Sequence, residues 1–122
     1  MNLLQLSKEI PCELHLDSTH RILYSTDASD YSERPLGVAY PRNRSDIQLI
    51  LRYCYQNSIP VIPRGGGTSL AGQVVGNGLV VDVSRYMTKI IEINSDEHYC
   101  WVEPGVIPDV LNKELEKYGL FW

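Results

Sequence analysis

The sequence has little of what marks membrane-spanning, secreted or nucleic-acid-binding proteins. No apolar run approaches the ~20 residues that are needed to span a bilayer. The N-terminus has neither the basic segment nor the long apolar segment of a secretory signal. The 11 lysines and arginines are outnumbered by 15 aspartates and glutamates, so the net charge of −4 disfavours binding to a nucleic-acid backbone. We therefore expect a cytoplasmic protein without a transmembrane segment and without a nucleic-acid partner.

Cysteine is also scarce, and its spacing excludes two common kinds of stabilised small domain. The three cysteines, Cys12, Cys54 and Cys100, are far apart and odd in number. No C-x-x-C pair and no Cys/His cluster accompanies them, which argues against a disulfide framework and against a zinc site. His15 and His20 likewise have no partners at metal-ligand spacing. We expect free thiols in a reducing compartment, surface histidines and no metal site.

The length of the chain suits one compact domain. There are 122 residues, and neither an internal repeat nor a low-complexity linker divides them. Residues 1–36 are predicted to contain a helix over residues 2–9, which Pro11 ends. An irregular arm over residues 12–34 is then predicted to wrap the surface of the domain. The regular part of the domain is predicted to begin at residue 37.

A strand, a helix and a second strand are predicted between residues 37 and 63. Residues 37–40 form a short apolar strand, and Ser45 begins a helix in which Gln48 completes an S-x-x-Q capping box. Apolar residues at helical spacing predict one buried face, made of Ile47, Ile50, Leu51, Cys54 and Tyr55. Residues 59–63 form the next strand. Because a βαβ unit joins parallel strands, the two strands should run in the same direction.

The remaining sequence predicts three more strands and a helix. Residues 79–83 are apolar except for Asp82, for which we favour a structural hydrogen bond over a ligand contact. Residues 89–103 contain two strands joined by a polar hairpin turn. The last helix is predicted to begin at Pro108 and to end at Gly119.

The most informative stretch is Pro63-Arg-Gly-Gly-Gly-Thr-Ser-Leu-Ala-Gly72, which lies between two predicted strands. Three consecutive glycines cost backbone entropy unless the chain needs a special conformation, such as a positive φ at Gly66, or a ligand approaches the backbone closely. Successive N–H groups in such a turn can form a concave anion nest. The stretch also follows the carboxyl end of a strand, where open α/β sheets place ligands. We predict a phosphate- or pyrophosphate-binding loop in preference to a simple turn.

Two familiar phosphate-binding motifs do not fit this stretch. Gly67 and Gly72 have the spacing of a P-loop, but Gln73 and Val74 replace its lysine and its hydroxyl residue. Gly65 and Gly67 fit the dinucleotide fingerprint, but leucine replaces its third glycine and a strand follows instead of a helix. A diphosphate here would therefore meet backbone nests and not a helix N-terminus.

The glycine-rich stretch, together with Val80-Val-Asp-Val-Ser-Arg85 and Val102-Glu-Pro-Gly-Val106, resembles the FAD-linked oxidase family. Ser25-Thr-Asp-Ala-Ser29 and Pro35-Leu-Gly-Val-Ala-Tyr-Pro41 are similar to N-terminal segments of that family. Its members include the glycolate oxidase flavin subunit and the D-lactate and D-2-hydroxyglutarate dehydrogenases. The resemblance implies an α+β fold, in which residues 37–122 form the α/β-like first lobe of an FAD-binding domain of the p-cresol-methylhydroxylase or vanillyl-alcohol-oxidase type.

The resemblance also implies a cofactor site. The residues that would hold the FAD diphosphate are Arg64, Gly65, Gly66, Gly67, Thr68, Ser69 and Gly72. Arg64 would either pair with a phosphate or brace the loop. Gly105 and Val106 would lie beside the adenosine end of FAD, although a plain strand-to-helix turn explains them equally well. Because the loop contains no histidine, the resemblance implies that FAD is held non-covalently.

The function that the resemblance implies is an FAD-dependent oxidoreductase acting on a small 2-hydroxy acid, such as glycolate, D-lactate or D-2-hydroxyglutarate. The family continues beyond this lobe into the rest of its FAD domain and a substrate domain. The chain would then be a fragment that is inactive alone, and no catalytic residue is assigned. Two alternatives stay open: a non-enzymatic nucleotide- or phosphate-binding module that uses the same nest, and a structural lobe without a ligand.

Overall fold

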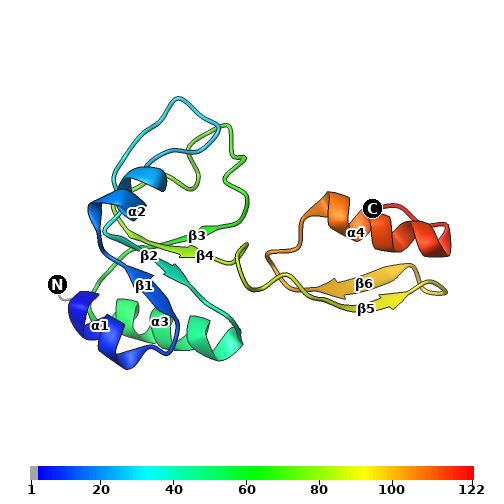
Figure 1. The fold of residues 1–122 in the computed structure, drawn as a ribbon, viewed down its shortest axis with the longest axis horizontal. Helices are drawn as coiled ribbons and strands as arrows, with labels where there is room; N and C mark the ends of the chain where they lie inside the picture. Colours follow the sequence, from blue (N-terminus) through cyan, green and yellow to red (C-terminus); the bar gives the residue numbers. More distant parts are fainter. Residues whose placement is uncertain (1–2) are drawn as a thin grey trace.

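The computed structural model describes residues 3–122, which form two bodies of different construction (Figure 1). The first body holds a four-stranded sheet and three helices, and the second holds a two-stranded hairpin and a helix. In chain order the elements are α1 (Leu3–Glu9), β1 (Glu13–His15), α2 (Ser18–Leu23), β2 (Gly37–Tyr40), α3 (Arg44–Gln56), β3 (Val61–Arg64), β4 (Leu79–Asp82), β5 (Ile90–Asn94), β6 (Tyr99–Val102), α4 (Pro108–Leu115) and η1 (Glu116–Tyr118). The predicted first helix is confirmed from Leu3 onward, and residue 2 lies outside the described residues.

β2 and β3 run parallel, as the βαβ pattern predicts, but they are not neighbours. The strand order is β1-β2-β4-β3, so β4 lies between them and pairs with both in parallel. Val80 of β4 lies opposite Val38 on one side and opposite Ile62 on the other. All four residues of β4 are buried, which is why its sequence is almost uniformly apolar.

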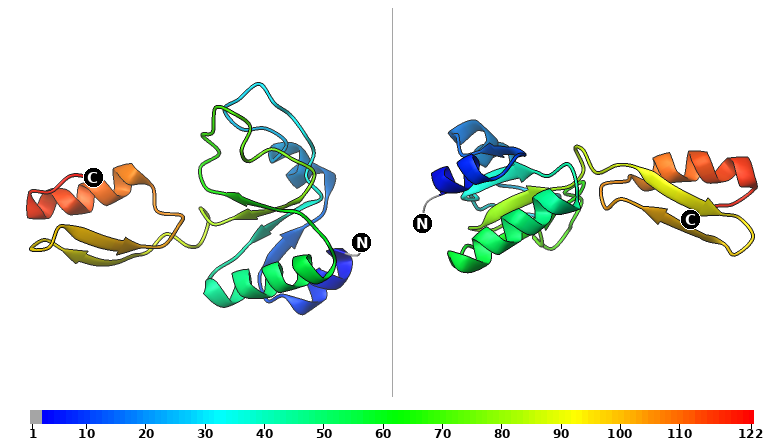
Figure 2. Two further views of the ribbon diagram at one scale, coloured as in Figure 1. Left: turned by 180° about the vertical axis from the view of Figure 1, so that it is seen from behind. Right: turned by 90° about the horizontal axis from the view of Figure 1, so that it is seen from below.

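Successive residues of the sheet face two separate apolar clusters. The cluster on one face joins the sheet to α1 and α3, and it contains Leu3, Leu6, Ile10, Cys12, Ala39, Ile50, Cys54, Ile59, Leu79 and Val81. The cluster on the other face is smaller and consists of Val38, Tyr40 and Val80, with Tyr24 and Ile62 packed against it. The right-hand view of Figure 2, seen from below, shows α3 covering one side of the sheet. The second face is left to α2 and to the loops that follow it.

The start of α3 differs from the prediction. The side chain of Asn43 accepts a hydrogen bond from the Asp46 N–H at 2.9 Å, so Asn43 is the N-cap. Ser45 already lies inside the helix, and the capping box predicted for it is wrong. An amide oxygen at position 43 meets the free N–H groups of the first turn as well as a hydroxyl would, and the helix starts two residues earlier.

The buried face of α3 is also narrower than predicted. Ile50 and Cys54 are buried, but Leu51 and Tyr55 are exposed, Tyr55 at 88%. The buried positions recur every four residues and include Asp46, which is 1% exposed. The sheet therefore covers one stripe of this helix and leaves its flanks open.

Residues 12–34 are more regular than predicted. β1 is an edge strand that pairs antiparallel with β2, α2 follows it, and Thr26 and Ser32 form an isolated bridge. Asp17 caps α2 by accepting a hydrogen bond from the His20 N–H at 3.1 Å. The expectation of an irregular arm is thus wrong for residues 13–15 and 18–23, because elements of three and six residues are too short to show a hydrophobic period.

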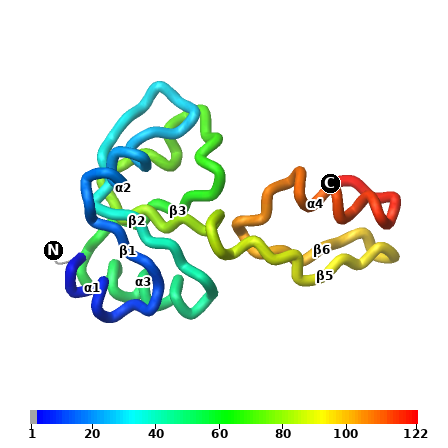
Figure 3. Tube along the Cα trace, viewed as in Figure 1, coloured from blue at the N-terminus to red at the C-terminus, as the bar shows by residue number. Residues whose placement is uncertain are grey.

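The second body confirms the predicted hairpin and last helix. β5 and β6 pair antiparallel, with a register shift between Ile90 and Glu92. α4 begins at Pro108, and Gly119, in the left-handed conformation with φ 68°, ends the 3-10 turn that continues it. The chain trace in Figure 3 shows this body projecting from the side of the first.

All three cysteines are free, as predicted. Cys12 and Cys54 are buried in the first body, and Cys100 is half-buried on β6. Burial raises the pKa of the Cys12 thiol to about 11, so this side chain stays protonated and unreactive at neutral pH. Within residues 3–122, no helix is both long enough and apolar enough to cross a membrane.

Candidate functional site

The glycine-rich stretch connects two parallel strands that lie side by side. β3 ends at Arg64 and β4 begins at Leu79, and no helix or strand interrupts the connection, residues 65–78. The carboxyl end of β3 therefore opens directly into this loop, as predicted. Figure 1 shows the connection in green next to the cyan segment that leads from α2 to β2. The two segments form one rim above the sheet.

The positive φ expected at the centre of the glycine run lies one residue later. Gly67 has φ +67° and Gly72 has φ +72°, whereas Gly66 has no positive φ. A β-carbon on Gly67 would lie 2.4 Å from Nη2 of Arg64, and one on Gly72 would lie 2.8 Å from the ring of Tyr31. The protein's own side chains therefore explain these two glycines, in addition to their backbone conformation.

Gly65 and Gly66 have no such internal explanation. A β-carbon on Gly65 would meet nothing within 4 Å, and one on Gly66 would meet only Cγ2 of Thr68 at 3.6 Å. Neither residue has a positive φ. Two adjacent residues therefore expose their backbone without a side chain, although the fold does not require glycine at either. Such an exposed backbone is typical of loops in which a ligand approaches the main chain.

Arg64 braces the loop. Its Nη1 donates a hydrogen bond to the carbonyl oxygen of Thr26 at 2.8 Å. Its guanidinium also lies over the ring of Tyr24, 4.9 Å from the centroid, and occupies the space that a β-carbon on Gly67 would need. A second link joins the same segments, because the Ala28 N–H donates to the Gly67 carbonyl oxygen at 3.1 Å. Of the two roles left open by the sequence, bracing is the one that these contacts give Arg64.

Ser69 is engaged inside the loop. Its hydroxyl oxygen accepts hydrogen bonds from the N–H groups of Ala71 at 3.3 Å and Gln73 at 3.1 Å. Ser69 therefore shapes the turn that follows the glycines. Thr68, by contrast, is exposed.

Asp27 places a carboxylate beside this turn. Its Oδ1 accepts a hydrogen bond from the Ser29 N–H at 2.8 Å, whereas Oδ2 is buried without a hydrogen-bond partner. The Ser29 side chain, and to a smaller extent the Ser69 side chain and the Val74 N–H, hold the pKa of Asp27 below its usual value. The carboxylate is therefore ionised at neutral pH, and it lies against the turn that Ser69 shapes.

Asp82, at the carboxyl end of β4, has the structural role that we favoured. Its Oδ2 accepts a hydrogen bond from the Tyr24 hydroxyl at 2.6 Å, and its Oδ1 accepts from the Ser84 N–H at 2.8 Å and the Ser84 hydroxyl at 2.6 Å. Burial and the Asp82 carboxylate raise the pKa of Tyr24 far above its usual value. Tyr24 thus joins Asp82 to Arg64 as one fixed unit beneath the loop.

Gly105 lies at the junction of the two bodies. A β-carbon on it would lie 2.2 Å from the Val83 carbonyl oxygen, and its N–H donates to the Met87 carbonyl oxygen at 2.8 Å. The close approach that a glycine permits here is made by the protein's own main chain. Val106 is half-buried and lines an apolar hollow with Cys100, Val102, Pro108, Leu111 and Trp122.

The structure therefore gathers one group of the predicted residues and adds others to it. Arg64 through Ser69 and Gly72 lie on one rim with Tyr24, Thr26, Asp27, Ala28 and Tyr31. The second set was missed because it precedes the loop by about 40 residues, and only the similarity of Ser25–Ser29 to a family segment pointed to it. Sequence spacing also missed a cluster of His15, Asp17 and His20 on the first body.

A family model described as an FAD binding domain matches residues 35–122, which contain the whole glycine-rich loop. The chain belongs to this family. It is 45% identical over 105 residues to a D-2-hydroxyglutarate dehydrogenase of Escherichia coli strain K12, covering 84% of this chain and 10% of that protein. It is 37% identical over 105 residues to the glycolate oxidase subunit GlcD of Bacillus subtilis strain 168, covering 84% of this chain and 22% of that protein. The chain thus spans between 10% and 22% of the length of these two relatives.

Solved structures share the fold. An alkyldihydroxyacetonephosphate synthase superposes with a TM-score of 0.81 at 20% identity, covering 96% of this chain and 24% of that one. Because the superposition covers 96% of this chain, it includes both bodies. The predicted fold class is confirmed: an α+β arrangement of parallel strands around a βαβ unit, followed by an antiparallel hairpin and a helix.

Proposed function

We propose that this chain supplies the diphosphate-binding wall of an FAD site in an oxidoreductase that acts on a small 2-hydroxy acid. The observation that carries the proposal is the bare backbone at Gly65 and Gly66, two glycines that no contact in residues 3–122 requires. Membership of the FAD binding domain family supports the cofactor. The names of two relatives, a D-2-hydroxyglutarate dehydrogenase and a glycolate oxidase subunit, support the substrate class.

The residues present fit the diphosphate of FAD. The N–H groups of Gly65 and Gly66 and the Thr68 hydroxyl would donate to phosphate oxygens, and the firmly held Arg64, Gly67, Ser69 and Gly72 would keep the loop in shape. When bound, the flavin ring supplies the redox chemistry, and the protein holds and orients it.

The proposal also covers the adenosine end of FAD, the domain boundary and the compartment. Gly105 and Val106 would flank the adenosine end, and FAD would be bound non-covalently because the loop has no histidine. We propose a boundary near residue 36, with the preceding segment forming an arm and residues 37–122 forming the first lobe of the FAD domain. We also propose that the protein works in the cytoplasm, which the three free thiols support.

The decisive experiment adds one methyl group at the open backbone. In the protein expressed from its complete reading frame, Gly66→Ala should weaken FAD binding by about tenfold, which is about 1.4 kcal/mol. The fold should be unaffected, because the new β-carbon would make an ordinary van der Waals contact with Cγ2 of Thr68 at 3.6 Å. The matched control is Gly76→Ala in the same loop, whose β-carbon points at Ile62 in the sheet, 3.2 Å from its Cδ1. Flavin fluorescence gives the affinity and circular dichroism gives the fold.

Each outcome separates the proposal from its competitors. Unchanged FAD affinity in Gly66→Ala would overturn the assignment of the loop as the diphosphate site. A non-enzymatic phosphate-binding module would bind inorganic pyrophosphate as tightly as FAD, and a structural lobe would bind neither. The 122-residue chain alone should bind FAD more weakly than micromolar, because it forms one wall of the site. An oxidoreductase of the proposed class should show bleaching of its flavin absorbance when a 2-hydroxy acid is added without oxygen.

A further inference from the structure

Three side chains with metal-binding chemistry meet on the first body, away from the glycine loop. His15 ends β1, Asp17 is the N-cap of α2, and His20 lies in the first turn of α2. One ligand atom from each lies within 4.8 Å of the other two. Asp17 Oδ2 is 2.7 Å from His20 Nδ1 and 3.9 Å from His15 Nδ1. The carboxylate therefore stands between two imidazoles.

Strand pairing, a helix cap and an aromatic contact hold these three side chains in place. His15 is held in the sheet by the pairing of β1 with β2, and Asp17 is held by its cap, in which Oδ1 accepts from the His20 N–H. The cap uses one carboxylate oxygen and leaves Oδ2 for the rings. The two imidazoles stack with centroids 3.8 Å apart, and both rest edge-on against the buried ring of Tyr40. The strand pairing, the cap and the contact with Tyr40 keep the three side chains close to one another before any ligand binds.

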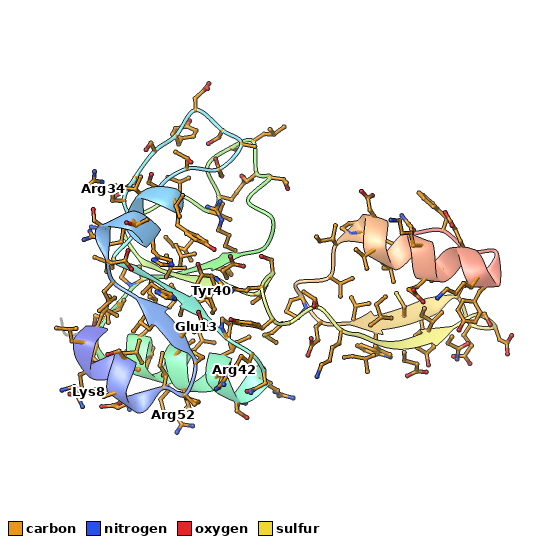
Figure 4. All side chains as sticks on the ribbon, in the orientation of Figure 1. Lys8, Glu13, Arg34, Tyr40, Arg42 and Arg52 are labelled. Atoms are coloured by element: carbon orange, nitrogen blue, oxygen red, sulfur yellow. The ribbon has the colours of Figure 1, made fainter. Side chains whose placement is uncertain are left out.

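A second carboxylate orients one of the rings. Glu13 is the cross-strand partner of Tyr40, and Figure 4 labels both residues. Its Oε2 is 3.2 Å from His15 Nε2, and its Oε1 accepts a hydrogen bond from the Tyr86 hydroxyl. A carboxylate only accepts, so the proton of a neutral His15 lies on Nε2 and the lone pair lies on Nδ1. Nδ1 of His15 lies 3.9 Å from Oδ2 of Asp17. Two acceptors facing each other favour a cation between them, and a carboxylate behind a ligating histidine is a recurrent feature of metal sites.

We propose that His15, Asp17 and His20 bind a divalent transition-metal ion of the borderline class, with Zn²⁺ as its representative. Two imidazoles and one carboxylate suit this class, and three protein ligands leave a fourth position for water. With bonds of about 2.1 Å, a tetrahedral ion needs its ligand atoms about 3.4 Å apart. The two imidazoles are stacked at an interplanar angle of 12°, so one ring has to rotate out of the stack before both nitrogens can reach the same ion.

The charges and protons are compatible with a dication. Glu13 and Asp17 bring two negative charges. The guanidinium of Arg85 brings one positive charge, and it lies over the ring of Tyr40, 4.7 Å from the centroid. His20 binds through Nδ1 only after the proton that this atom shares with Asp17 has left for solvent or for Nε2.

Such an ion would tie the edge strand β1 to α2. α2 leads directly to Tyr24, Thr26 and Ala28, which contact Asp82 and the glycine loop. Binding to the folded state alone stabilises it by mass action. The expected consequence is a rise in the melting temperature of the first body. This effect does not depend on FAD.

The test uses the 122-residue chain, without a histidine tag and with a non-thiol reductant, titrated with Zn²⁺ in a calorimeter. We expect one equivalent to bind and the melting temperature to rise. His15→Gln and His20→Gln should abolish both effects. Asp17→Asn should also abolish them, although asparagine keeps the helix cap. Glu13→Gln should weaken binding by about tenfold, as expected for a residue that orients a ligand.

The control is His98→Gln in the distant β5–β6 turn, which should bind Zn²⁺ like the unchanged protein. Co²⁺ in place of Zn²⁺ should give absorbance of nitrogen and oxygen ligation without a thiolate charge-transfer band, which distinguishes this site from the cysteines. The proposal is overturned if no Zn²⁺ binds at neutral pH. It is also overturned if Asp17→Asn and His20→Gln bind as tightly as the unchanged chain.

Discussion

Gly66 and Gly67 are adjacent in the sequence, but a β-carbon would meet different surroundings on each. On Gly67 it would lie 2.4 Å from Nη2 of Arg64, and the residue has φ +67°. On Gly66 it would meet Cγ2 of Thr68 at 3.6 Å, and the residue has no positive φ. The fold needs the glycine at 67, whereas ligand access is what remains to explain the one at 66.

This difference predicts a contrast in stability between two otherwise equal substitutions. Gly67→Ala should lower the free energy of unfolding by about 1–3 kcal/mol, because it adds backbone strain and displaces the guanidinium. Gly66→Ala should change it by less than about 0.5 kcal/mol. Urea denaturation of the two variants measures both values. In the double variant Gly67→Ala/Arg64→Ala, the effects should be less than additive, and full additivity would show that the two residues do not interact.

At the level of single residues, the sequence predicted the glycine-rich loop but not the residues that hold it in place. Three glycines followed by Thr68 and Ser69 stand out because few backbones require them. Arg64 was assigned to the site with two possible roles, and only the contacts with Thr26 and Tyr24 distinguish them. Asp27 could not be predicted, since its buried oxygen depends on a fold that brings it to residues more than 40 positions away.

Among the elements, α3 shows how a local signal can be assigned to the wrong residue. Asn43 and Ser45 are both good cap residues, and a capping box favoured the second. Asn43→Ala should lower the free energy of unfolding by about 1 kcal/mol, because the Asp46 N–H loses its partner. The matched control is Ser45→Ala, which lies inside the helix and should be nearly neutral. Equal losses in the two variants, measured by thermal or urea unfolding, would contradict the assigned cap.

Element type was predictable where a period extends over enough residues. The helices α3 and α4 and the strands from β2 to β6 all carry such a period or an apolar run, and all were predicted near their observed bounds. β1 and α2 are too short to show one. The position of β4 between β2 and β3 could not be read either, because side-chain periods report burial and not which strands are neighbours.

For the whole molecule, the junction between the two bodies should be sensitive to substitution of Gly105. A β-carbon there would lie 2.2 Å from the Val83 carbonyl oxygen and 2.7 Å from that of Met87, and neither is a flexible side chain. Gly105→Ala should therefore cost about 1–3 kcal/mol by overpacking and open the junction. Hydrogen exchange at the Gly105 amide, now bonded to Met87, should become faster. Gly65→Ala is the control, since its added methyl meets nothing within 4 Å.

The strand order has a consequence for how the chain is made. Of the three parallel strands β2, β4 and β3, β4 lies in the middle, yet it is the last of the three to be synthesised. Until it emerges from the ribosome, β2 and β3 have no partner between them, and their apolar edges stay open. The glycine-rich connection must then allow β4 to insert between β2 and β3. Nascent chains of this protein should therefore acquire their sheet in one late step, and depend most on chaperones just before it.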